Sequence, residues 1–286
     1  MSQPLTKAQS AAQVYHEYMV PAMFDPWAEM LVAQADLQPG EVVLDVACGT
    51  GAVTRQAARK VGEAGQVSAL DLNPAMLEVA RSLPVQSLSP QGLPPQGLLA
   101  AEGAAVTWVQ GSAQSLPFPD GMFGVVLCQH GLPFFPDRVG ALAEMRRVLQ
   151  PDGRLLITVW RSLERNPMSL ALNAATLRLV GLPVYSAPFV LGEPGALESL
   201  LNEAGFGRVK VSERSCEIRF ATPEHFAARN LQASAAAIPV LAAMDDAERT
   251  DLARRLQNEM GGLLKENVRD GMLVTSLSGW IGEAWL

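Results

Sequence analysis

Runs of branched apolar residues alternate with amphipathic stretches over the first 160 residues of the chain. The run at 41–46 leads into a glycine-rich turn and then into a stretch at 52–61 with helical periodicity. The same pattern predicts further strands at 66–71, 106–110, 125–129 and 154–160. It predicts further helices at 8–35, 73–82 and 137–149. Strands and helices that alternate in this way are typical of a parallel sheet with right-handed crossovers.

Local signals refine two of these helices. Asn73 is expected to cap the helix that follows it, with Pro74 in the first helical position. Within 8–35, Pro21 and Pro26 are expected to interrupt the helical run, because proline lacks the backbone N–H that a helix interior uses.

Beyond Trp160 the alternation becomes less regular. The later pattern predicts helices at 166–181, 193–206, 223–236 and 245–266, and strands at 208–220 and 272–286. We expect these helices to roof a pocket. Between the helix at 73–82 and the strand at 106–110, the proline- and glycine-rich segment 83–104, with the repeat P-Q-G-L, is expected to form a mobile loop or lid. The predicted division is an N-terminal helical cap at 1–40 and a main domain at 41–286, with helical insertions at about 161–193 and 222–270.

Composition limits the class of protein. With 49% hydrophobic and 18% charged residues, the chain can bury a substantial core. A net charge of −7 argues against binding the phosphate backbone of a nucleic acid. The three cysteines form no C-x-x-C pair, so we expect neither a metal site nor a disulfide framework. No signal peptide or membrane span is expected, and the predicted location is the cytoplasm.

The stretch "VVLDVACGTGAV" at 42–53 resembles a nucleotide-binding turn, and three ligands compete for it. A phosphate-binding P-loop needs Lys-Ser/Thr directly after the glycines, which this turn lacks. A dinucleotide motif needs a third glycine where Thr54 stands, and Asp45 would lie beside a pyrophosphate. S-adenosylmethionine (SAM) carries an ammonium and a sulfonium, which Asp45 could attract directly or through water.

Asp71 ends the second predicted strand, 20 residues after Gly51. A carboxylate at that place suits the paired ribose hydroxyls of either NAD or SAM. The glycines of the preceding turn let the backbone approach a ligand closely. These residues therefore predict adenosine recognition without separating the two cofactors.

Four ordered motifs, "VLDVACGTG", "ALDLNPAML", "GSAQSLPFPDGMFGVVLCQHGL" and "EMRRVLQPDGRLLITVW", resemble those of class I SAM-dependent methyltransferases. They are most similar to the quinone-biosynthesis-type branch, which acts on small molecules. The resemblance covers about 11–160 strongly and the later strands loosely. It implies a Rossmann-like, doubly wound α/β fold with a seven-stranded sheet in the order 3-2-1-4-5-7-6, the last strand antiparallel, and helical lid elements.

The resemblance also implies cofactor-binding roles. Asp71 would take the ribose hydroxyls, Leu72 would pack on the adenine, and Ser112 would lie by its edge. Two departures stand out: Ala47 replaces a frequent glycine, and Ser112 stands where many relatives have Asp, so it would accept from the adenine amino group more weakly. The full set is Asp45, Ala47, Gly49, Gly51, Asp71, Leu72, Ser112, Ala113 and Gln129.

His130 is the candidate catalytic residue, because it follows the fourth strand where the crevice opens. Its imidazole could act as a general base or could simply hydrogen-bond a loop carbonyl. Tyr15, His16 and Tyr18 could cap the pocket from the N-terminal helix. The pair at 134–135, "FF", is expected to be core beneath a helix rather than a substrate platform.

The sequence thus predicts methyl transfer from SAM to a small, apolar or aromatic metabolite by in-line displacement, in which alignment supplies much of the rate. Two alternatives remain: a SAM-binding protein without methyl transfer, such as a cyclase or regulatory binder, and a nicotinamide-dependent dehydrogenase. The acceptor, its O, N or C target atom and the oligomeric state stay open.

Overall fold

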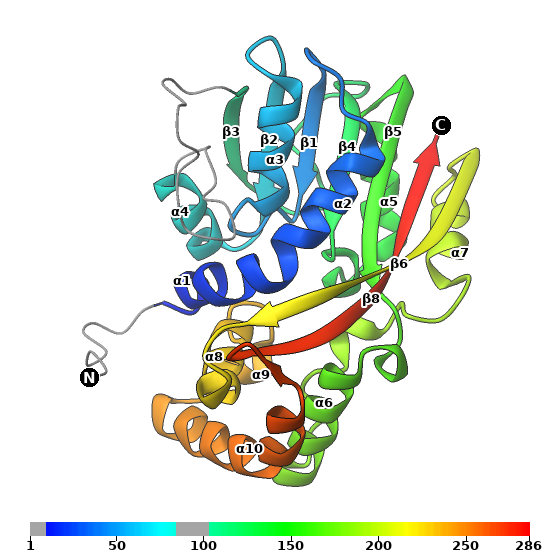
Figure 1. The fold of residues 1–286 in the computed structure, drawn as a ribbon. Helices are drawn as coiled ribbons and strands as arrows, with labels where there is room; N and C mark the ends of the chain where they lie inside the picture. Colours follow the sequence, from blue (N-terminus) through cyan, green and yellow to red (C-terminus); the bar gives the residue numbers. More distant parts are fainter. Residues whose placement is uncertain (1–9, 84–102) are drawn as a thin grey trace.

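The structure is a computed structural model of the 286-residue chain, and it describes residues 10–83 and 103–286 (Figure 1). The predicted insertion at 83–104 therefore lies almost entirely outside the described residues. In Figure 1 an α/β part lies above a smaller helical part, and the two longest strands run from one into the other.

One mixed sheet organises the α/β part. Its strands lie in the order β3-β2-β1-β4-β5-β8-β6, and the two-residue β7 pairs with β8. The pairs among β1 to β5 are parallel, whereas β8 is antiparallel to both β5 and β6. The predicted order is confirmed, since β8 holds the place of the expected antiparallel seventh strand. The strands are β1 (Val42–Val46), β2 (Gln66–Asp71), β3 (Ala105–Gln110), β4 (Phe123–Gln129), β5 (Leu149–Trp160), β6 (Arg208–Phe220), β7 (Val268–Arg269) and β8 (Met272–Trp285).

Helices cover both faces of the sheet and build the lower part. In Figure 1, α2 and α3 lie in front of the sheet, and α5 and α7 lie behind it. The α-helices are α1 (Ala11–Val14), α2 (Asp25–Ala35), α3 (Ala52–Val61), α4 (Pro74–Ser82), α5 (Arg138–Arg147), α6 (Pro167–Val180), α7 (Ala196–Glu203), α8 (Phe226–Ser234), α9 (Pro239–Ala242) and α10 (Asp246–Glu266). The shorter or wider helices are η1 (Tyr15–Phe24), η2 (Leu132–Phe134), η3 (Leu163–Arg165), η4 (Ala187–Phe189) and η5 (Pro223–His225).

Local chemistry defines the start of α4 as predicted. The side chain of Asn73 accepts a hydrogen bond from the backbone N–H of Ala75 at 2.9 Å, and Pro74 occupies the first helical position. The main chain of Asn73 is extended, so the chain changes direction at this residue. Asn73 therefore marks the junction between the end of β2 and the helix.

The predicted interruption of the N-terminal helix at Pro21 is wrong. The chain continues through Pro21 as the π-helix η1 and passes directly into α2. A π-helix is wider than an α-helix and has a different hydrogen-bonding pattern, which accommodates a residue without a backbone N–H. Pro26 lies in the first turn of α2, where its missing N–H is tolerated.

The long pair β6 and β8 extends beyond the rest of the sheet. These strands pair from Arg208↔Trp285 to Phe220↔Leu273, but the pairing of β8 with β5 ends at Trp160↔Gly279. The residues beyond that point project past the carboxyl edge of the parallel strands. They carry α6, α8 and α10 opposite that edge (Figure 1).

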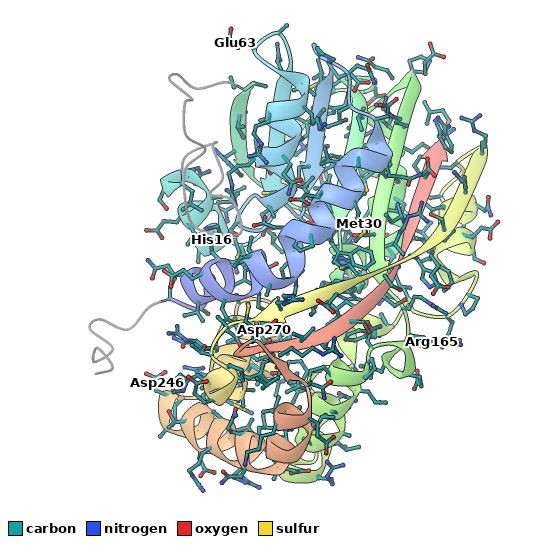
Figure 2. All side chains as sticks on the ribbon, in the orientation of Figure 1. His16, Met30, Glu63, Arg165, Asp246 and Asp270 are labelled. Atoms are coloured by element: carbon teal, nitrogen blue, oxygen red, sulfur yellow. The ribbon has the colours of Figure 1, made fainter. Side chains whose placement is uncertain are left out.

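Buried side chains fill the space on both faces of the sheet (Figure 2). One core cluster includes Trp27 and Leu31 of α2 and continues to Phe226 and Leu256 of the helical part. The other lies under α5 and includes Leu142 and Met145. The first cluster joins the α/β part to the helical lid through continuous apolar packing, which fixes the lid opposite the strand ends.

Candidate functional site

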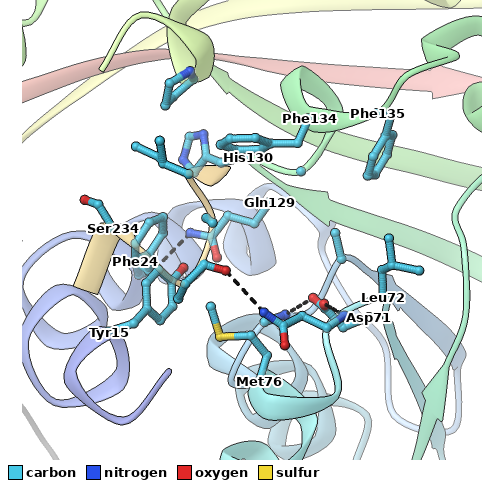
Figure 3. Close-up of a pocket in the computed structure, with 18 of the residues that line it drawn as sticks. Tyr15, Phe24, Asp71, Leu72, Met76, Gln129, His130, Phe134, Phe135 and Ser234 are labelled. Atoms are coloured by element: carbon cyan, nitrogen blue, oxygen red, sulfur yellow. Dashed lines mark hydrogen bonds between the residues drawn. The ribbon is translucent and has the colours of Figure 1, made fainter. Parts of the chain in front are cut away.

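A cavity of about 550 Å³ lies at the carboxyl ends of β1, β2 and β4, beneath the helical part (Figure 3). Ligands of open α/β sheets bind at this edge, where the crossover connections diverge. The sequence-predicted residues and the lid meet here. The wall is formed by Tyr15, Met19, Met23 and Phe24, by Ala47 and Gly49, by 70–73 and Met76, by 111–114, by 129–131 and 134–136, by Trp160, Ser169 and Leu172, and by the lid residues Tyr185, Pro188, Phe189, Asn230, Ser234 and 236–238.

The turn after β1 uses left-handed backbone conformations. Ala47 has φ +57°, Gly49 has φ +55° and Gly51 has φ +86°. Ala47 thus takes a conformation that favours glycine, as the resemblance suggests for its position. Its methyl group lies where a Cβ on Gly131 would be only 2.6 Å away. Glycine at 131 therefore makes room for the alanine at 47.

Gly49 and Gly51 have different neighbours. A Cβ on Gly49 would have only the Tyr15 ring within 4.0 Å, so this glycine faces the cavity. A Cβ on Gly51 would lie 2.6 Å from the Trp108 ring and 2.9 Å from the Arg55 guanidinium. Position 51 therefore requires glycine, because its φ is positive and a side chain would clash beneath the turn. Gly51 does not line the cavity.

Asp45 lies almost wholly inside the protein, with 1% of its surface exposed. Its Oδ2 accepts a hydrogen bond from Thr54 Oγ1 at 2.5 Å, and its Oδ1 has no partner among the described residues. Burial is the main cause that raises the pKa of Asp45 to about 7; the charge of Asp71 adds to the rise, and the Thr54 hydrogen bond opposes it. Asp45 borders a small hollow of about 30 Å³ beside the main cavity, which is room for a bridging water.

Asp71 forms the floor of the cavity at the end of β2 (Figure 3). Its two carboxylate oxygens accept hydrogen bonds from the backbone N–H groups of Gly49 at 2.7 Å and Asn73 at 2.8 Å. A further backbone hydrogen bond comes from Leu72, and since a carboxylate has about four acceptor positions, one remains for a ligand. Burial raises the pKa of Asp71, while these hydrogen bonds counteract the rise. The carboxylate thus ties the glycine turn to the start of α4.

The residues predicted to surround an adenine also line the cavity. Leu72 is 69% exposed, which is unusual for leucine and leaves its side chain available to a ligand. Ser112 and Ala113 lie in the same wall, and Ser112 Oγ accepts from the backbone N–H of Gln114 at 3.2 Å. The structure therefore brings every predicted cofactor residue except Gly51 to the wall of one of the two hollows.

The N-terminal helices close one side of the site. Gln129, at the end of β4, donates from Nε2 to the backbone carbonyl of Phe24 at 2.8 Å. The ring of Tyr15 lies over Gly49. His16 Nδ1 is 3.1 Å from Thr50 Oγ1, and burial together with Arg55 lowers the pKa of His16 to about 4. His16 is thus neutral at pH 7 and braces the turn.

The structure differs from two predictions about aromatic residues: that Tyr18 could cap the pocket, and that Phe134 belongs to the core. Tyr18 packs against Phe220 and is not part of the cavity wall. Phe134 is 40% exposed and lines the cavity together with Phe135, so the expectation of a pure core role is wrong for Phe134. Phe134 ends the short helix η2, in which Leu132 and Pro133 are buried and Phe134 is not.

His130 lies in the aromatic wall rather than in a polar network. It has φ +55°, is 5% exposed and stacks on Trp160 with ring centroids 3.6 Å apart. Its edge contacts Trp27 and Phe24. Both ring nitrogens are shielded from water, and neither has a partner among the described residues. Burial lowers the pKa of His130 well below 6.5, so the ring is neutral at pH 7.

The cavity wall includes residues that sequence reasoning did not single out. Met19, Met23 and Phe24 come from η1, and Tyr185 and Ile238 come from connections in the helical part. For Tyr185 and Ile238 the signal in the sequence was the loss of strand–helix alternation after residue 160, and for the residues of η1 it was the predicted N-terminal helix. Both signals predicted elements but not the side chains that line the cavity. Within residues 10–83 and 103–286, the cavity wall has one carboxylate, Asp71, and no lysine or arginine.

The donor set fits SAM. An orphaned, buried carboxylate oxygen on Asp45 suits a nearby cationic group, and Asp71 suits a pair of hydroxyls. At the position of the third glycine in a dinucleotide motif, Thr54 is buried and holds Asp45. Gly49 has no side chain toward the cavity, so the backbone there would lie close to a bound ligand.

Residues 10–83 and 103–286 contain neither a membrane-spanning helix nor a metal-binding cluster. None of the helices in this part of the chain is long and apolar enough to cross a membrane. No cluster of three or more histidine, cysteine, aspartate or glutamate side chains suited to a metal ion is found in it either.

Comparison with known proteins shows the family of the chain. Residues 44–157 match the family described as "Methyltransferase domain". The chain is 34% identical over 231 residues to the ubiquinone/menaquinone biosynthesis C-methyltransferase of Marinomonas sp., covering 71% of this chain and 84% of that protein. It is 35% identical over 173 residues to the protein of the same name from Paraburkholderia phymatum, covering 56% of this chain and 65% of that relative, just under two thirds of its length.

Solved structures share the fold. The YcgJ protein of Bacillus subtilis superposes with a TM-score of 0.54 at 17% identity, over 90% of this chain and 97% of that one. Phosphoethanolamine N-methyltransferase 2 of Haemonchus contortus, in complex with phosphomonomethylethanolamine and S-adenosylhomocysteine, gives a TM-score of 0.56 at 16% identity, over 97% of this chain and 58% of that one. The matched domain and the Marinomonas relative show a methyltransferase. The chain belongs to the class I SAM-dependent methyltransferase family, in its quinone-biosynthesis branch.

Proposed function

We propose that this protein transfers a methyl group from SAM to a small, uncharged, apolar or aromatic metabolite. The observation that carries the proposal is the division of one cavity into two ends. The polar end holds the Gly49 turn and Asp71, and His130, Phe134 and Phe135 lie across the cavity from Asp71 (Figure 3). Pockets of this size with a few convergent polar groups are typical of small-molecule sites.

The residues of the polar end would hold the cofactor. Asp71 would accept the ribose hydroxyls, Leu72 would pack on the adenine, and Asp45 would attract the cationic end. SAM supplies an electrophilic methyl group whose transfer forms one bond to the acceptor and breaks one carbon–sulfur bond, with loss of a proton from a hydroxyl or ring-carbon acceptor. The chain contributes alignment and exclusion of water, which can supply much of the rate.

The acceptor end favours a neutral molecule. A carboxylate or phosphate entering it would lose its hydration without meeting a lysine or arginine among the described wall residues. Aromatic rings such as those of Phe24, Phe134 and Trp160 favour planar partners. The C-methylation named for the relatives makes a ring carbon of a quinol one candidate target.

An acceptor screen tests the proposal. The purified protein is incubated with SAM and a panel of benzoquinols, naphthoquinols, simple phenols, indoles and carboxylated phenols, and release of S-adenosylhomocysteine is measured. We expect turnover with neutral aromatic members and little with carboxylated ones. Cofactor binding without release for any member would favour the second candidate, a SAM-binding protein that performs no transfer.

Replacement of His130 with glutamine should leave near-normal turnover and a flat pH profile around pH 6.5. The reason is that both ring nitrogens are shielded and the ring stacks on Trp160, so we propose that His130 shapes the acceptor wall. The measurement is initial rate against pH, with His225→Gln as the matched control on an exposed histidine. A fall in rate on the order of 10²–10⁴-fold, with cofactor affinity unchanged, would instead assign His130 as the general base.

A further inference from the structure

Hydrogen bonds of Asn73 connect the end of β2, the start of α4 and the loop after α8. Its backbone N–H donates to Asp71 Oδ1 at 2.8 Å, and its side-chain oxygen caps α4. Its side-chain Nδ2 donates to the backbone carbonyl of Ala236 at 3.2 Å, although the two residues are 163 positions apart. One side chain thus connects the end of β2 with the loop after α8.

The loop that Asn73 reaches is part of the acceptor wall. Segment 234–238 turns the chain between α8 and α9 and places Ser234, Ala236 and Ile238 on the cavity. Figure 3 shows Ser234 and Asp71 on the two sides of the cavity. Two backbone hydrogen bonds hold the turn of segment 234–238. The carbonyl of Ser234 accepts from the N–H of Ala237 at 3.0 Å and from the N–H of Ile238 at 2.8 Å.

We propose, on the basis of the function proposed above, that Asn73 is a positioning residue that couples cofactor binding to the acceptor wall. A cofactor held by Asp71 stiffens the carboxylate and the backbone of Asn73, and the Asn73 amide transmits that order to segment 234–238. The acceptor then meets a formed wall when the cofactor is already bound. By linkage, an acceptor resting on this wall strengthens cofactor binding by the same factor.

The substitution Asn73→Ser isolates the donor. Serine is as good an N-cap as asparagine and keeps the backbone N–H to Asp71, but its side chain is too short to reach Ala236 and has no amide. Asn73→Asp serves as a second variant that keeps the shape and the cap and has no N–H to donate at neutral pH. An equal effect in both variants assigns the coupling to the lost donor.

Hydrogen exchange measures the coupling without turnover. Backbone exchange in a peptide covering 231–242 is followed with and without saturating S-adenosylhomocysteine. We expect the ligand to slow exchange of the 236–238 amides roughly threefold to tenfold in the natural protein, the scale of one hydrogen bond, and to have little effect in Asn73→Ser. The affinity for S-adenosylhomocysteine, measured by calorimetry, should stay within about threefold, since the variant keeps the cap and the Asp71 contact.

A matched control loosens the same helix from its other end. Gln257 of α10 accepts from the backbone N–H of Ala227 and donates to the carbonyl of Pro223, so Gln257→Ala frees the start of α8. This variant should speed exchange at the start of α8 and keep the ligand-dependent slowing at 236–238. A merely structural role for Asn73 would make the two variants behave alike.

Other results would contradict either the coupling or the proposed function. If the ligand binds and slows exchange at 236–238 equally in the natural protein and in Asn73→Ser, or does not slow it in either, the coupling is overturned. If S-adenosylhomocysteine does not bind the natural protein at all, the proposed function itself fails. With an acceptor from the screen, Asn73→Ser should raise the acceptor KM severalfold more than the SAM KM, and equal changes in both would contradict the proposal.

Discussion

Asp71→Ala should bind SAM about 1–3 kcal/mol more weakly than the natural protein, a loss of roughly fivefold to more than a hundredfold in affinity. The carboxylate would accept the ribose hydroxyls, and it also holds the backbone N–H groups of Gly49 and Asn73. Alanine removes both functions, because the two N–H groups lose their acceptor and the glycine turn loses its tie to α4.

Calorimetry with SAM, S-adenosylhomocysteine and NAD measures this effect. The natural protein should bind the first two and show no comparable binding of NAD. Glu63→Ala is the control, since Glu63 is an exposed acid at the far end of the molecule from the cavity (Figure 2). Unchanged affinity in Asp71→Ala would remove Asp71 from the cofactor site.

The sheet could be predicted from the sequence because its signals are local. The stretch "QVSALD" and the helix at 52–61 have the predicted limits in the structure, and Asn73 caps α4 as expected. The order of the strands was implied by the resemblance, which is strong over about 11–160 and loose over the later strands, and the long strand at 208–220 was predicted from its alternation. Each of these features depends on residues that are close in the sequence or on the ordered motifs of the family.

The acceptor wall could not be predicted because its residues meet only through tertiary packing. Segment 234–238 reaches the end of β2 because β6 and β8 extend past the sheet and carry α8 there. Tertiary packing also explains why Gly51 does not line the cavity. A Cβ added at this position would meet Trp108 of β3, a contact that the motif alone does not reveal. Similarly, the shielding of the His130 nitrogens depends on Trp27 and Trp160, which come from distant parts of the chain.

Asp45, the acidic residue of the first motif, should make cofactor binding depend on pH. In the free protein the pKa of Asp45 is raised to about 7, first by burial and then by the charge of Asp71. Below pH 7 the carboxyl is mostly protonated, so binding a cationic ligand beside it must release a proton. The affinity for SAM should therefore rise by up to about tenfold per pH unit below pH 7 and level off above about pH 8.

Asp45→Asn should flatten this profile and at the same time stabilise the free protein at alkaline pH. The folded chain binds the Asp45 proton more tightly than the unfolded chain, where the pKa is 3.8, so the carboxyl's contribution to stability is full below about pH 4 and is lost as the pH rises through about 7. The raised pKa corresponds to at most about 4 kcal/mol, and asparagine avoids this loss because it carries no charge.

Calorimetry of SAM binding and denaturant unfolding, each at pH 5 and pH 8, measure the two effects. The stability of Asp45→Asn relative to the natural protein should be higher at pH 8 than at pH 5, while SAM affinity at pH 8 falls. Asp152→Asn, at an exposed aspartate, should change neither quantity. If Asp45→Asn binds SAM as tightly as the natural protein at pH 8, Asp45 only braces the turn through Thr54. A loss of affinity with a gain in stability would mean that the chain keeps a destabilising buried charge because the cofactor requires it.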